Sequence, residues 1–154
     1  MNDLNQLAIL RSLLVGLSAT LGTMVLHGLA VHTIIMKMRR DLKLGRLGIR
    51  LPGNLTFVSS TMLLLLAGHI LEIALWAYVL NLCGAGGDFR EALYCSAGSY
   101  TTVGSGDVVL SPPWRLLGPF EAATGMLMFG VSTALIFAVI QRLIHARLDG
   151  AEHN

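Results

Sequence analysis

The sequence has few charged residues, since Asp, Glu, Lys and Arg together make up only 13% of its 154 residues. A water-soluble domain usually carries about 25%. Apolar residues instead account for 54% of the chain, and its mean hydropathy is positive. The composition therefore excludes an ordinary soluble domain and indicates a protein that lies mostly in lipid.

Cysteine is also scarce, with only Cys83 and Cys95 present. Their spacing fits neither a zinc motif nor a secreted disulfide framework, so we expect buried or lipid-facing thiols. The net charge is only +2. Because the basic residues gather in one segment, a membrane surface explains them and no nucleic-acid partner is expected.

Three apolar stretches occupy residues 12–36, 55–83 and 116–140. Each has the roughly 20 residues that a hydrocarbon core about 30 Å thick requires. The sequence thus predicts an all-α membrane protein with three transmembrane helices, the second preceded by a chain break at Pro52, Gly53 and Asn54.

The segment between the first two stretches, residues 37–50, is strongly basic. Its one acidic residue is Asp41, and its basic residues are Lys37, Arg39, Arg40, Lys43, Arg46 and Arg50. Such a loop stays in the cytoplasm. We therefore expect a multi-pass protein of the cell (inner or plasma) membrane with its amino terminus outside and its carboxyl terminus cytoplasmic. Anionic lipids are the expected partners of residues 37–50.

The long connection at residues 84–115 carries helix signals of its own. Asp88 is a good N-cap and Glu91 stands three residues later, which predicts a helix over 89–100. Such a helix would descend about 18 Å into the membrane, and an extended run over 102–106 would return about 16 Å toward the outer surface. This balance predicts a re-entrant pore helix and loop, because non-helical backbone is tolerated at membrane depth only beside protein or water.

A polar, glycine-rich run over 99–107 follows that helix. Four copies around one axis would present rings of carbonyl oxygens that replace the water around a monovalent cation. The backbone must then alternate between ordinary and mirror-image dihedrals, and glycine does so at little cost. The candidate filter residues are Thr101, Thr102, Val103, Gly104, Ser105 and Gly106.

This run resembles the potassium-channel signature Thr-Val-Gly-Tyr-Gly-Asp, and the resemblance covers residues 55–143. It implies a homotetrameric, passive K⁺ channel that holds K⁺ ions in its filter and needs no organic cofactor. Residues 1–54 would add a helix and basic loop, 55–143 would form the pore domain, and 144–154 a short cytoplasmic tail. Residues 124–130 resemble the inner helix, where Gly125 and Gly130 serve either bending or tight packing.

The sequence also departs from the family pattern around the filter. Ser105 replaces the tyrosine, Tyr94 and Cys95 replace an aromatic pair, and Gly98 stands where some relatives carry a carboxylate, while Asp107 is retained. With fewer aromatic side chains behind the filter than the family pattern has, the carbonyl oxygens are held less firmly, which predicts relaxed K⁺ selectivity. A non-selective monovalent cation channel and a non-conducting membrane scaffold remain alternatives.

Ionisable residues inside membrane helices indicate function by default. His69 and Glu72 are three residues apart and share one helical face. We expect a buried hydrogen bond between helices there, with a proton or metal site as the alternative. His27 and His32 do not share a helical face, so we expect an interfacial or hydrogen-bonded role for them and no metal site between them. Because no third partner is evident for His69 and Glu72, no enzyme is predicted.

Overall fold

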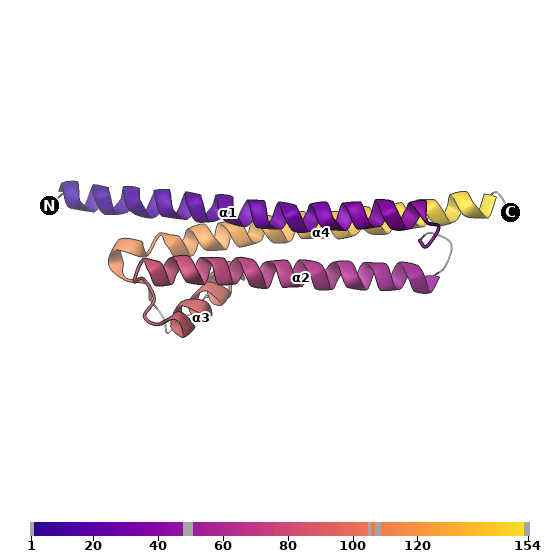
Figure 1. Cartoon of the computed structure of the whole chain (residues 1–154). Helices are drawn as coiled ribbons and strands as arrows, with labels where there is room; N and C mark the ends of the chain where they lie inside the picture. Colours follow the sequence, from indigo (N-terminus) through magenta and orange to yellow (C-terminus); the bar gives the residue numbers. More distant parts are fainter. Residues whose placement is uncertain (1, 48–50, 105, 107–108, 153–154) are drawn as a thin grey trace. The chain divides into compact units, whose positions relative to one another are not determined.

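The computed structural model describes residues 2–47, 51–104, 106 and 109–152. These residues form four α-helices and one 3₁₀ turn, with no strand among them. The elements are α1 (Asn2–Lys43), α2 (Leu51–Leu82), α3 (Phe89–Tyr100), η1 (Pro112–Trp114) and α4 (Leu117–Glu152), as labelled in Figure 1. The predicted all-α fold is confirmed.

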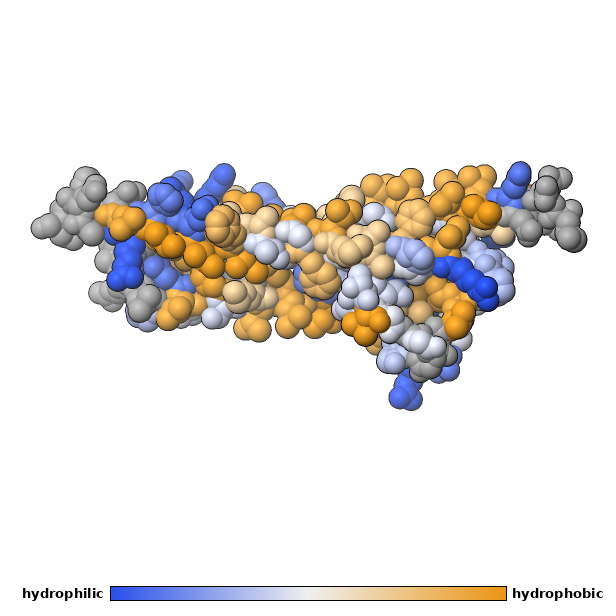
Figure 2. Space-filling view, turned by 180° about the vertical axis from the view of Figure 1, so that it is seen from behind, coloured by the Kyte–Doolittle hydropathy of each residue, from blue (hydrophilic) through white to orange (hydrophobic). Residues whose placement is uncertain are grey.

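Three segments are long and apolar enough to cross a membrane, namely Gln6–Lys43, Pro52–Leu82 and Pro112–Leu148. In their most apolar windows only 22%, 33% and 28% of the residues are buried. Figure 2 shows apolar side chains over much of the visible surface. Because water would not tolerate so much exposed apolar surface, the chain is a multi-pass membrane protein.

The helix ends differ from the sequence-based expectation at several points. The break expected at Pro52, Gly53 and Asn54 is wrong, because α2 already begins at Leu51. Proline is tolerated in a first turn, where its missing N–H has no intrahelical partner in any case. The last helix is also longer than its apolar stretch, since α4 continues to Glu152.

The chain packs as two compact units, each built from parts of the same three long helices. The first unit comprises residues 1–27 and 69–129, and the second comprises 28–68 and 130–154. The second has its own core of Ile34, Leu47, Phe57, Leu65, Val139 and Leu143. The first contains α3 and all the candidate filter residues, and its core includes Trp76, Leu80, Cys95, Tyr100 and Leu117.

Within the first unit, α1 packs closely on the other two long helices. A Cβ atom on Gly16 would lie 3.1 Å from the Phe120 ring, so the missing side chain makes room for that ring. The Trp76 indole donates a 3.0 Å hydrogen bond to the Thr23 hydroxyl. Small residues allow such close approach of membrane helices, and hydroxyls then join them.

Helix α3 begins and ends as the sequence predicts. The Asp88 carboxylate accepts a 2.9 Å hydrogen bond from the Glu91 N–H, which caps the first turn. Farther along, Ser96 donates to the Ile73 carbonyl at 2.8 Å and hydrogen-bonds the buried Glu121 carboxyl. These contacts hold α3 against α2 and α4.

Candidate functional site

The candidate filter begins where α3 ends. The Thr101 N–H donates to the Ala97 carbonyl at 3.2 Å, and the Thr101 hydroxyl donates to the same oxygen at 2.6 Å. The Gly104 N–H donates to the Gly98 carbonyl at 3.0 Å. These bonds satisfy carbonyls that the helix terminus would otherwise leave unpaired, and they fix the start of the run against α3.

Mirror-image backbone occurs at alternate positions of this run. The φ angle is 62° at Thr102 and 81° at Gly104. The sequence predicts such alternation at the glycines Gly104 and Gly106, and Gly104 has the expected positive φ. Thr102 was not expected to adopt one, because a positive φ is a genuine outlier for a β-branched residue. Strained backbone of this type is typical of functional sites.

The run lies on the surface of the single chain. Its described residues are all exposed, namely Thr101, Thr102, Val103, Gly104 and Gly106, and Val103 is 82% exposed. Ser105 and Asp107 lie outside the described residues. Non-helical backbone exposed in this way is tolerated at membrane depth only where further protein or water lies beside it.

The expected supports of the filter occupy different environments. Cys95 is buried in the core, Gly98 is half-buried, and Tyr94 is exposed. Cys83 is half-buried, which agrees with the buried or lipid-facing thiols that the sequence predicts. Tyr94 therefore has surface available for contacts outside its own chain.

The two glycines of the inner helix also differ. A Cβ atom on Gly125 would lie 2.1 Å from the Tyr100 carbonyl oxygen, which is far too short for a non-bonded contact. At Gly130 nothing lies within 4 Å of such an atom. Gly125 thus provides close packing against the end of α3, whereas bending at Gly130 stays a prediction.

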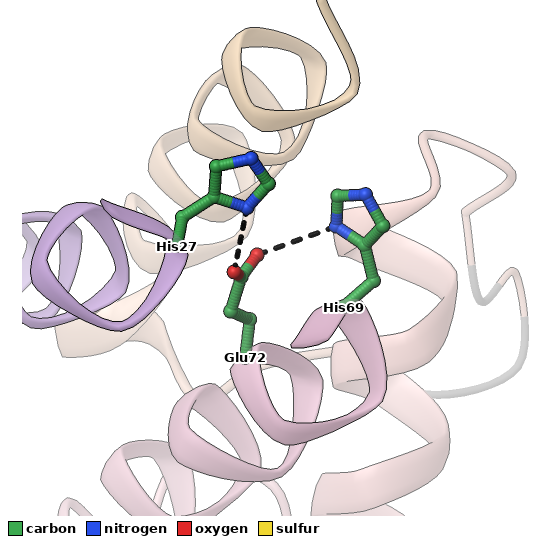
Figure 3. A group of neighbouring side chains, drawn as sticks. All are labelled: His27, His69 and Glu72. Atoms are coloured by element: carbon green, nitrogen blue, oxygen red, sulfur yellow. Dashed lines mark hydrogen bonds and ion pairs between the residues drawn. The ribbon is translucent and has the colours of Figure 1, made fainter. Parts of the chain in front are cut away.

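A buried polar cluster lies beside the start of the filter. His27 from α1 and His69 from α2 both direct Nδ1 at the Glu72 carboxylate, at 2.9 Å from Oε1 and 3.3 Å from Oε2 respectively (Figure 3). All three residues are buried, Glu72 completely. The sequence analysis gave His69 and Glu72 no third partner, and the structure corrects this with His27.

Tyr100 connects this cluster to the filter. It is the last residue of α3, is completely buried, and donates its hydroxyl to Glu72 Oε2. The Phe129 ring packs on both His69 and Tyr100, with centroids 4.5 and 5.6 Å apart. The contact between Tyr100 and Glu72 was not predicted from the sequence, because a tyrosine at the end of a short predicted helix does not indicate a partner 28 residues away.

Comparison with known proteins gives one match. A family model described as "Ion channel" matches residues 58–142, more than half of the chain. This range contains α3, the candidate filter, His69 and Glu72, and it begins after α1. No curated protein and no solved structure matches the chain.

Proposed function

Because this chain belongs to the ion-channel family, we propose that it conducts K⁺ passively across the cell membrane as a tetramer of identical chains. Thr101, Thr102, Val103, Gly104, Ser105 and Gly106 form its selectivity filter. The observation that carries the proposal is the exposed run directly after α3 with positive φ at Thr102 and Gly104. Alternate mirror-image residues turn successive carbonyl oxygens toward the same side, where they can replace the hydration shell of a cation.

Assembly into a tetramer follows from the single filter in each chain. One copy supplies one wall of a pore, and closed rotational symmetry supplies the others. The exposed surfaces of Val103 and Tyr94 would then be covered by neighbouring copies, and the polar backbone of the run would line water. The negative C-terminal ends of four α3 helices would favour a cation below the filter.

The basic segment at residues 37–50 supports an orientation in the membrane. Residues 37–50 are cytoplasmic, so the amino terminus is outside and the carboxyl terminus inside. In the second unit, Lys37 and Arg46 line a hollow of about 460 Å³ together with Asp41 and Ser60. Anionic lipid headgroups are the partners we propose for this hollow.

Ion flux into proteoliposomes tests the function. Gly104→Ala should abolish K⁺ flux while leaving the oligomer intact, because a Cβ atom penalises φ = 81° by about 1 kcal/mol in every subunit. Gly45→Ala is the matched control. Gly45 has φ = 66° and nothing within 4 Å of an added Cβ, so it bears the same local strain away from the filter.

The two variants separate the alternatives. Flux that is lost in Gly104→Ala and retained in Gly45→Ala supports a carbonyl filter. Normal flux through Gly104→Ala would show that this run is not the filter. Absence of flux through the wild-type oligomer under K⁺ or Na⁺ gradients would instead favour a non-conducting membrane scaffold.

A further inference from the structure

We propose that His27, His69 and Glu72 form a binding site for one divalent transition-metal ion, of which Zn²⁺ is the best fit. Each residue offers a ligand atom, and these atoms all lie within 4.8 Å of one another. All three side chains are buried, and they come from two different helices, α1 and α2. The site is separate from the filter, and its existence does not depend on K⁺ conduction.

The donor set matches zinc chemistry. Two imidazole nitrogens and one carboxylate form a ligand set that Zn²⁺ uses in proteins, with a fourth position left open. Imidazole suits Zn²⁺ and the neighbouring transition metals, whereas Mg²⁺ and Ca²⁺ prefer oxygen donors. The cluster therefore discriminates against the abundant divalent ions of the cell.

The geometry is close to what a tetrahedral ion needs. Bonds of about 2.0–2.2 Å place neighbouring tetrahedral ligand atoms about 3.3–3.6 Å apart. Here Nδ1 of His27 lies 2.9 Å from Glu72 Oε1, and Nδ1 of His69 lies 3.3 Å from Glu72 Oε2. As Figure 3 shows, both rings direct a nitrogen at the carboxylate, and the ligand atoms all lie within 4.8 Å of one another, so side-chain rotation about a common centre would bring them onto one ion.

The surroundings supply what such a site requires. Tyr100 donates its hydroxyl to Glu72 Oε2, which is the kind of hydrogen bond that orients a ligating carboxylate. The Tyr100 hydroxyl oxygen also lies 3.1 Å from His69 Nδ1, so the same hydroxyl contacts two of the three ligand side chains. Burying a charged carboxylate is costly unless it is paired or coordinates a metal, and a divalent cation held here would supply that positive charge.

Co²⁺ is the probe for this site, because four-coordinate Co²⁺ absorbs visible light. The full-length protein, purified without a histidine tag, should bind one Co²⁺ per chain with a visible absorption band. Zn²⁺ should displace the Co²⁺, and Mg²⁺ should not. Zn²⁺ should also raise the thermal unfolding midpoint, because a ligand that binds only the folded state stabilises it. A folded wild type that shows no band and no shift would overturn the proposal.

Variants then locate the metal. Asn places an amide nitrogen near the position of Nδ1, so His27→Asn and His69→Asn can keep a hydrogen bond to Glu72 while losing a ligand. Each should weaken Co²⁺ binding by about 100-fold or more, since even the loss of a group that only hydrogen-bonds a ligand costs about 10–100-fold in metal affinity. Tyr100→Phe removes the hydroxyl that hydrogen-bonds Glu72, so it should weaken Co²⁺ binding by about 10–100-fold.

His32→Asn is the matched control, because His32 is also on α1 but outside the cluster. Its Co²⁺ affinity should equal that of the wild type. If the band persists unchanged in a folded His27→Asn, His69→Asn double variant, other groups hold the metal and the assignment is wrong. If the double variant does not fold, Tyr100→Phe decides, and wild-type affinity in that variant would overturn the proposal.

Discussion

Gly125 shows how the absence of one side chain determines the packing of the pore region. The Tyr100 carbonyl oxygen occupies the space where a Cβ atom of residue 125 would lie, at 2.1 Å. Tyr100 is the last residue before the candidate filter and also hydrogen-bonds Glu72. Any side chain at position 125 must therefore displace backbone at the filter entrance.

Substitutions at the two inner-helix glycines should have opposite effects on stability. Gly125→Ala should lower the free energy of unfolding by about 1–3 kcal/mol, because the neighbouring atom is backbone and cannot rotate away. Gly130→Ala should raise it by up to about 1 kcal/mol, since alanine favours helix and nothing lies within 4 Å. Thermal unfolding of the purified oligomers measures both. Equal midpoints would contradict the packing described for Gly125.

At the scale of secondary structure, α3 depends on its cap and its neighbours. It has only 12 residues, and helices of that length are marginal in isolation. Asp88 caps its first turn, while Ser96 and Tyr100 attach it to α2 and α4. Helix α1 lies outside the range matched by the family model, yet Thr23 and His27 on it bond Trp76 and Glu72 of α2. Helix α1 is thus part of the framework around α2, which itself holds α3 through Ser96 and Tyr100.

Loss of the α3 cap should be measurable by itself. Asp88→Ala removes the side chain that accepts from the Glu91 N–H, and it should cost about 1 kcal/mol of stability. Asp88→Asn keeps an acceptor at the same place and should retain most of that stability. Chemical or thermal denaturation of the two variants makes the comparison. If Asp88→Asn is as destabilised as Asp88→Ala, charge and not capping is the cause.

At the scale of the whole molecule, the basic segment at residues 37–50 is the basis of the proposed orientation in the membrane. Asn2→Cys, made in a Cys83→Ser background, should react with a membrane-impermeant maleimide added outside intact cells. Cys95 is buried and does not interfere. Lys43→Cys in the same background should react only after the membrane is permeabilised. The reverse pattern would overturn the proposed orientation.

Ion selectivity is likewise a property of the assembled pore. Ser105 replaces the tyrosine of the potassium-channel signature, and an aromatic ring there would add packing behind the carbonyl ring. Ser105→Tyr should therefore raise the preference for K⁺ over Na⁺, and a tenfold rise corresponds to about 1.4 kcal/mol. Reversal potentials under mixed K⁺ and Na⁺ measure it. A wild type that is already as selective as the variant would contradict the expected weakening.

Local sequence determined most of the elements. Long apolar runs specify membrane helices because lipid leaves backbone polar groups no other partner, and the Asp88 cap with Glu91 three residues later specifies where α3 begins. Glycine at position 104 likewise predicts a positive φ, because glycine lacks the Cβ atom that makes this conformation costly. These features depend on neighbouring residues alone, so sequence periodicity and spacing are sufficient to find them.

Tertiary structure decided which distant residues meet. His27 and Glu72 are 45 positions apart, and only the packing of α1 on α2 brings their side chains together. The close approach of Gly125 to the Tyr100 carbonyl is also a consequence of packing, since a glycine in a helix does not by itself demand such a neighbour. A helix buries one face against whichever element the whole fold places beside it, and the sequence of that helix alone does not specify which element that is.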